Sequence, residues 1–146
     1  MSEFNLKDKT IYTSWTEATI RYSDLDPNGH VNNGAINAFC EDGRVQFRNS
    51  KMIKLADDIL VGFVLVKFSV EYHAALHYPG SVEIGTAVTR VGGSSYTLGQ
   101  GVFDGEKCVA SAEVITVRID PETQKSAPLS DELKEILNAS LARSKA

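Results

Sequence analysis

Residues 24–33 read DLDPNGHVNN, so two acids, a histidine and three asparagines lie within ten positions. A carboxylate can act as a general base or a nucleophile, and a histidine can transfer protons. The Asp-Pro-Asn-Gly sequence is also an excellent turn, because each of these residues suits a turn position. The stretch therefore indicates either a chemical site or a well-formed turn, and the residue types alone favour the turn.

A helix is predicted directly after this stretch, over residues 34–50. Its apolar residues recur at roughly helical spacing, at Ile36, Phe39, Cys40, Val45 and Phe47. Gly43 is the weak point of this pattern, and Asn32 or Asn33 is the expected N-cap. A helix N-terminus offers unpaired N–H groups and the positive end of the helix dipole beside the polar stretch.

The remaining elements are predicted to be mostly strands. A first strand is expected over residues 14–22, where β-branched and aromatic residues partly alternate with polar ones. Four β-prone segments follow the helix, over residues 59–76, 81–91, 95–103 and 107–119. Asp104-Gly105 is a strong hairpin signal, so the last three strands should form an antiparallel meander.

A short amphipathic helix is expected near the C-terminus, with Ser130 as its N-cap. The apolar face of this helix would carry Leu133, Ile136, Leu137 and Leu141. The predicted fold class is α+β, with a long helix against a curved antiparallel sheet of about five strands. Residues 1–146 show no internal repeat or linker and are expected to form one domain. An exposed sheet edge usually needs covering, so a homo-oligomer is expected.

Composition narrows the class of protein. Hydrophobic residues make up 42% of the 146 residues and charged residues 23%, which is typical of a globular protein. The formal net charge is -4, and no run of Lys or Arg favours nucleic-acid binding. No segment suits a signal peptide or a membrane span, and Cys40 and Cys108 are isolated. We therefore expect a cytoplasmic protein without cofactor, nucleic-acid partner or membrane association.

Two other site types are disfavoured. His73 and His77 have the spacing of a helical zinc pair, but their segment is predicted to be a strand. There they would lie roughly 13 Å apart, too far for one ion. Both cysteines are expected to be small core residues. The sequence lacks a Gly-x-Ser-x-Gly elbow, so neither a metal site nor a serine hydrolase is predicted.

Residues 21–33, followed by Glu41 and Arg44, resemble the hotdog-fold thioesterases. The similarity is greatest to the group that contains 4-hydroxybenzoyl-CoA thioesterase and the acyl-acyl-carrier-protein thioesterases. The D-x-D-x-N-x-H-V-N-N pattern is fairly specific, and the strand order and the C-terminal segment also agree. The resemblance implies that a sheet wraps the long helix, that two protomers join their sheets, and that active sites lie at the dimer interface.

The resemblance also implies site residues. It assigns the role of base or nucleophile to the second acid, Asp26, and the oxyanion donor to the backbone N–H of Asn33. In the acyl-carrier-protein group, an Asp, an Asn and a His at this spacing carry the site, and they match Asp26, Asn28 and His30. Asn28 could orient water or the carboxylate. His30 could be a general acid or base, or could simply fix the turn.

Neighbouring charged residues are given structural roles. Asp24 is expected to be structural. Glu41 is expected to be half-buried and paired with Arg44 or Arg21. Because coenzyme A is polyanionic and the protein is acidic, binding would depend on local cations. Arg90, Ser94 and Ser95, at a hairpin whose glycines could leave N–H groups accessible, are the candidates for this contact.

The predicted function is hydrolysis of an acyl-CoA or acyl-carrier-protein thioester. The negative net charge offers no attraction to an acidic carrier protein, which favours acyl-CoA. A hotdog-fold hydratase or dehydratase and a non-catalytic acyl-CoA-binding module remain alternatives. A homodimer or homotetramer is the expected assembly.

Overall fold

The computed structural model describes residues 4–52 and 62–143, and its elements follow the predicted order. Its helices and strands are β1 (Ser14–Thr19), α1 (Asn33–Lys51), β2 (Phe63–Tyr72), β3 (Ser81–Val91), β4 (Ser95–Asp104), β5 (Lys107–Arg118) and α2 (Asp131–Ala139). Short 3-10 helices span Lys9–Ile11 and Tyr22–Asp24. The expected α+β class is confirmed, while the predicted residues 59–61 lie outside the described part.

The five strands form one antiparallel sheet in the order β1-β3-β4-β5-β2. The hairpin-linked strands β3, β4 and β5 lie side by side, as the turn signals predicted. β1 pairs with β3 on one side, and β2 pairs with β5 on the other. β1 and β2 are therefore the edges of the sheet, and each has one free side within the chain.

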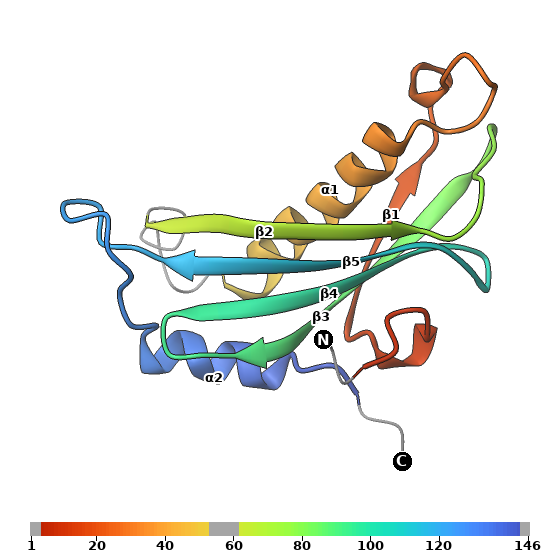
Figure 1. The fold of residues 1–146 in the computed structure, drawn as a ribbon. Helices are drawn as coiled ribbons and strands as arrows, with labels where there is room; N and C mark the ends of the chain where they lie inside the picture. Colours follow the sequence, from red (N-terminus) through yellow and green to blue (C-terminus); the bar gives the residue numbers. More distant parts are fainter. Residues whose placement is uncertain (1–3, 53–61, 144–146) are drawn as a thin grey trace.

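Helix α1 lies across one face of the sheet and packs on β3, β1 and β4 (Figure 1). Its buried side chains include Ile36, Phe39 and Cys40, which join Ile84 and Val102 of the sheet in one core cluster. This burial of one apolar helix face removes several large side chains from water and supplies most of the helix stability.

Gly43, the weak point of the helical pattern, allows this close packing. A Cβ at Gly43 would lie 2.8 Å from Cγ2 of Ile84 and 3.1 Å from Nε2 of Gln100. Gln100 is fully buried, and its amide donates to the Cys40 carbonyl at 2.9 Å and to Thr86 Oγ1 at 3.1 Å. Glycine thus lets the helix approach the sheet closely enough for this hydrogen bond between the two layers.

Helix α2 packs beside β3 (Figure 1). The Ser130 hydroxyl accepts the Leu133 N–H at 3.1 Å, so the predicted N-cap is confirmed. Leu133 and Leu137 are buried against Val88, Tyr96 and other residues of a second core cluster. Leu141 was expected on the same helix face, but α2 ends at Ala139 and Leu141 is 39% exposed.

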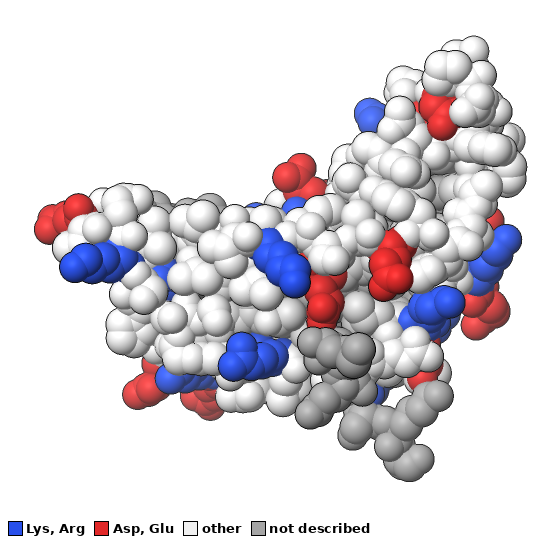
Figure 2. All heavy atoms as spheres, in the orientation of Figure 1, with Lys and Arg blue, Asp and Glu red and all other residues white. Residues whose placement is uncertain are grey.

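Two surface properties bear on the expected class. No helix in residues 4–52 and 62–143 has the length and apolar character that crossing a bilayer requires. Basic and acidic side chains are interspersed on the face shown in Figure 2. The charged side chains on this face therefore form no patch of one sign.

Candidate active site

The Asp26 carboxylate closes the turn that precedes α1. Its Oδ1 accepts the N–H groups of Asn28 at 2.9 Å and His30 at 3.2 Å. The backbone adds two bonds, from the Asp26 N–H to the His30 carbonyl and from the Gly29 N–H to the Asp26 carbonyl. Gly29 has φ +82°, a left-handed conformation that glycine adopts without strain. The turn therefore fixes the orientation of the carboxylate through one oxygen.

The other oxygen, Oδ2, makes no hydrogen bond among those found for the described residues. Asp26 is only partly buried, so this oxygen can meet water or a substrate atom. A carboxylate that is held by one oxygen and open at the other suits a general base or a nucleophile.

Asp24 lies at the start of the same turn and binds Arg21. It is 5% exposed, and its carboxylate accepts the Arg21 N–H at 2.8 Å and Arg21 Nη2 at 3.0 Å. Burial by itself raises the pKa of Asp24, but the bonds from Arg21 outweigh burial and lower the pKa below its ordinary value. These contacts agree with the structural role expected for Asp24.

The start of α1 leaves one donor facing this turn. Asn32 is the N-cap, because its Oδ1 accepts the Gly34 N–H at 2.7 Å, and its own N–H donates to the Asp24 carbonyl at 2.8 Å. Within the described chain, no hydrogen bond uses the Asn33 N–H, the first of the helix. A free N–H at a helix N-terminus is well suited to stabilise a developing oxyanion.

Asp26, His30 and Asn33 line one cleft of about 340 Å³. Its opposite wall is the end of β2, at Tyr72, and the segment that follows, including His73, Ala74 and Leu76. The segment is tied to the turn by the Val31 N–H, which donates to the Leu76 carbonyl at 2.8 Å. The cleft thus combines a carboxylate, an imidazole and a free N–H with an apolar wall, the combination expected of a binding site.

The imidazole of His30 is exposed and lies edge-to-face against that of His77, with ring centroids 5.1 Å apart. The analysis of the sequence considered His77 only as a metal ligand and missed this contact. The strand that was predicted through both histidines ends at Tyr72, because the chain turns there to bury Leu76. The strand spacing used to separate His73 from His77 is therefore wrong.

Tyr72 is a second residue that the sequence analysis missed. Its hydroxyl donates to Asn37 Oδ1 at 2.5 Å, which joins the end of β2 to the second turn of α1. The sequence places Tyr72 within a β-prone run, but a β-prone run does not indicate a contact with Asn37 of the helix. Asn28, in contrast, is not among the residues that line the cleft, and only its backbone N–H contacts Asp26.

Two expected partners differ from those observed. Glu41 is exposed rather than half-buried, and Arg21 binds Asp24 instead. Successive residues turn about 100° around the helix axis, so Glu41 points away from the sheet although its neighbour Cys40 is buried. Cys40 itself is fully buried, and burial raises the pKa of its thiol to about 12, so it is no candidate nucleophile. Cys108 is only half-buried.

Arg90, Ser94 and Ser95 are not brought to this cleft within the chain. They lie at the β3–β4 hairpin, next to the core cluster that holds Phe47 and Met52 at the far end of α1. Helix α1 has 19 residues. At 1.5 Å per residue, it separates the hairpin from Asp26 by roughly 28 Å. The Gly92 N–H is also not free, since it donates to the Ser95 carbonyl at 2.7 Å.

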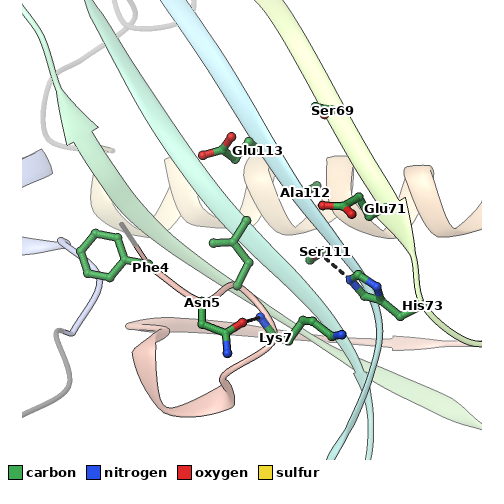
Figure 3. A pocket seen from close by; sticks show the side chains of 10 residues that line it. Phe4, Asn5, Lys7, Ser69, Glu71, His73, Ser111, Ala112 and Glu113 are labelled. Atoms are coloured by element: carbon green, nitrogen blue, oxygen red, sulfur yellow. Dashed lines mark hydrogen bonds between the residues drawn. The ribbon is translucent and has the colours of Figure 1, made fainter. Parts of the chain in front are cut away.

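A larger hollow of about 440 Å³ lies on the sheet face opposite α1, between β2, β5 and the N-terminal segment (Figure 3). There His73 Nε2 lies 2.8 Å from Ser111 Oγ, and Glu71 and Glu113 flank the pair. None of the residues that line this hollow belongs to the N-terminus of α1, whose free N–H lies in the Asp26 cleft. We therefore place the candidate active site in the smaller cleft.

A long helix wrapped by a five-stranded antiparallel sheet, with a carboxylate beside the helix N-terminus, defines the hotdog class of thioester-processing proteins. Residues 20–137 match the family described as the thioesterase-like superfamily. An acyl-CoA thioester hydrolase, YbgC of Escherichia coli, is 30% identical over 115 residues, which cover 75% of this chain and 84% of the relative.

Solved structures agree on the fold. A predicted thioesterase from Bacillus stearothermophilus has a TM-score of 0.80 at 22% identity, covering 90% of this chain and 98% of that one. A Thermus thermophilus thioesterase complexed with coenzyme A and Zn has a TM-score of 0.76 at 23% identity, covering 88% and 95%. The chain belongs to the thioesterase-like superfamily and has the hotdog fold.

Proposed function

We propose that this protein hydrolyses acyl-CoA thioesters to a free acid and coenzyme A, with Asp26 as general base or nucleophile. The observation that carries the proposal is the pairing, in one cleft, of a carboxylate open at Oδ2 with the unbonded N–H of Asn33. YbgC, the relative named as an acyl-CoA thioester hydrolase, supports the choice of reaction and carrier.

In the proposed reaction, the thioester carbonyl oxygen points at the Asn33 N–H. Water attacks the carbonyl carbon while Oδ2 of Asp26 takes its proton, or Oδ2 attacks directly to give an anhydride that water then opens. The negative charge that develops on the carbonyl oxygen is stabilised by the N–H and by the helix dipole. Collapse breaks the C–S bond, and the thiolate takes up a proton.

His30 and Asn28 receive secondary roles. The exposed imidazole of His30 lies in the same cleft as Asp26 and could donate the proton to the departing thiolate. Its contact with His77 orients the ring. Asn28 acts mainly through its backbone N–H, which holds Oδ1 of Asp26.

We also propose a dimer joined at the β2 edges. Val64, Leu65 and Val66 of this edge strand are 41%, 45% and 56% exposed, which is a large apolar exposure for a strand with one free side. Antiparallel pairing of two β2 strands about a two-fold axis would cover these side chains and complete the hydrogen bonding of both edges.

The same two-fold axis would bring the second half of the proposed carrier site to Asp26. It reverses the direction of the partner sheet, so the partner's β3–β4 hairpin would lie at the end of the joined sheet where Asp26 is. Its distance across the sheet is three to four strands, roughly 15–20 Å at ~4.8 Å per strand. Arg90, Ser94 and Ser95 could then contact the nucleotide of a coenzyme A whose thioester is at Asp26.

The test is incubation of the purified protein with a panel of acyl-CoAs, with free thiol followed by a chromogenic disulfide. Thiol release above the rate without enzyme supports the proposal. Hydration of an enoyl-CoA chain without thiol release would instead indicate a hydratase, and binding without turnover would indicate an acyl-CoA-binding module.

A further inference from the structure

A third pocket, of about 210 Å³, lies between the C-terminal half of α1 and the sheet. Its walls are Phe63 and Leu65 of β2, Leu98 of β4 and Val45 of α1, and its polar lining includes two arginines, Arg44 and Arg48. At about 30 Å³ per water-sized group, it has room for roughly seven such groups. The pocket thus has a mixed lining, in which apolar side chains alternate with two arginines and the acid Glu41.

Neither arginine forms an ion pair within the described residues. The acid in the lining, Glu41, is exposed and attracts Arg44 without pairing with it. Arg44 donates to the neutral Gln100 Oε1 at 3.3 Å and lies 5.1 Å from the centre of the Phe68 ring. Burial lowers the pKa of its guanidinium, which reflects the loss of hydration.

Arg48 has fewer contacts than Arg44. Its Nε is completely shielded from solvent and has no hydrogen-bond partner among the described residues. A buried donor without an acceptor is unfavourable, and more so when it carries charge. A ligand that carries a hydrogen-bond acceptor would satisfy Nε of Arg48.

The lining beside Arg48 also offers donors. Tyr96 is buried and forms a hydrogen bond with Thr116, and both residues line the pocket. Burial raises the pKa of Tyr96, so its hydroxyl remains protonated at neutral pH. Guanidinium groups only donate, and they bind a carboxylate with two parallel bonds. The pocket therefore fits an anionic acceptor, and a carboxylate fits best.

The pocket lies on the same side of α1 as the Asp26 cleft. Asn33 lines the cleft, Asn37 binds Tyr72, and Arg44 and Arg48 line the pocket, so these residues follow helical spacing beside β2. From Asn33 to Arg48 the helix rises roughly 22 Å, and an arginine side chain leans several ångströms back towards the N-terminus. The guanidinium is thus on the order of 15 Å from the oxyanion donor, the span of roughly twelve carbons at ~1.3 Å per bond.

We propose that this pocket, with Arg48 as its main determinant, binds a carboxylate at the far end of the acyl chain, so that the preferred substrates are ω-carboxyacyl-CoAs of about twelve carbons. The proposal rests on the function proposed above and names its substrate class. The acyl chain would run along the β2 side of α1, with its thioester at Asn33 and its carboxylate at Arg48. It would pass the Tyr72–Asn37 hydrogen bond, which spans this side and would have to open. Hydrolysis then releases a dicarboxylic acid and coenzyme A.

The test compares dodecanedioyl-CoA with dodecanoyl-CoA, which differ only at the far end of the chain. We expect kcat/KM for dodecanedioyl-CoA to exceed that for dodecanoyl-CoA by roughly 10- to 100-fold, the effect of one hydrogen bond between charged groups. Arg48→Met, which keeps the apolar stem, should abolish this ratio. Lys51→Met removes a cation from an exposed position of the same helix and should leave the ratio unchanged.

Calorimetric binding of the monomethyl ester of dodecanedioic acid and of methyl dodecanoate separates this proposal from the proposed function, because each ester stands in for the thioester and only the first has a carboxylate at the far end. Tighter binding of the monomethyl ester to the wild type, lost in Arg48→Met, supports the pocket even if no thioester is cleaved. Turnover of both substrates at equal kcat/KM, or a preference that survives Arg48→Met, would overturn it and leave thioester hydrolysis intact. Equal affinity for the two esters would also overturn it, and would mean that the protein itself neutralises Arg48, for instance through a partner subunit.

Discussion

Replacement of Asp24 by Asn separates the structural acid from the proposed catalytic acid two residues away. In the wild type, the Asp24 carboxylate accepts the Arg21 N–H at 2.8 Å and lies 3.0 Å from the Arg21 guanidinium. Asparagine keeps an acceptor for the N–H but loses the charge that faces the guanidinium. A hydrogen bond to a charged group contributes about 1.5–3 kcal/mol. Because the Arg21 side chain is 73% exposed, solvent screens the ion pair, and its share is about 1 kcal/mol or less.

We therefore expect Asp24→Asn to lower the free energy of unfolding by about 1–3 kcal/mol. At about 2–4 °C per kcal/mol for a chain of this size, the melting temperature should fall by about 2–12 °C. Turnover should change by only a few-fold, because the turn that orients Asp26 keeps its own hydrogen bonds. Differential scanning calorimetry and the thiol-release assay on the same preparation measure both effects.

The pH dependence gives an independent check of the same interaction. The pKa of Asp24 is lower in the folded protein than its ordinary value of 3.8, so folding favours the charged form. The stability that Asp24 contributes is therefore complete above the unfolded value and is lost as the pH falls below it, through the folded pKa. The gap in melting temperature between wild type and Asp24→Asn should close in acid. An unchanged melting temperature at neutral pH, or a large loss of turnover, would refute the assignment.

Three further perturbations test the fold, the assembly and the second site group. Gly43→Ala places a Cβ 2.8 Å from Ile84 and should destabilise the protein by about 1–3 kcal/mol in thermal unfolding; an unchanged melting temperature would mean that the helix can shift freely. Val66→Asp puts a charge on the exposed β2 edge and should convert the dimer to monomers, as measured by light scattering. A wild-type protein that is a stable monomer of about 15.9 kDa, the mass of one chain, would contradict the proposed interface. His30→Gln should lower turnover roughly 10- to 100-fold and alter the pH–rate profile if the imidazole transfers a proton; wild-type kinetics with a lower melting temperature would make His30 structural.

The sequence was informative where local rules decide the structure. Helix α1 was predicted within one residue of its observed bounds at each end, because its apolar spacing and N-cap are local signals. The three hairpin-linked strands followed from turn residues in the same way. The family resemblance of the D-x-D turn pointed to Asp26, which lines one cleft with Asn33 at the start of the helix, and its catalytic role stays a prediction.

The errors arose where distant residues decide. The end of β2 at Tyr72 depends on burial of Leu76 and on its bond to Val31, neither of which is visible in a β-prone run. The partner of Arg21 is an exception, because a local 3-10 turn that was not predicted brings Asp24, three residues on, within reach. The arginine pocket is built from α1, β2, β4 and β5, so sequence spacing alone could not predict it.

The central claim is that Asp26 performs the chemistry, and the most direct measurement is kcat of Asp26→Asn in thiol release from an acyl-CoA that the wild type cleaves. Asparagine preserves an acceptor for the N–H groups of Asn28 and His30, so the turn should persist and the melting temperature should stay close to that of the wild type. Loss of the base or nucleophile should lower kcat by at least about 100-fold. A folded Asp26→Asn variant that retains wild-type kcat would contradict the proposed mechanism.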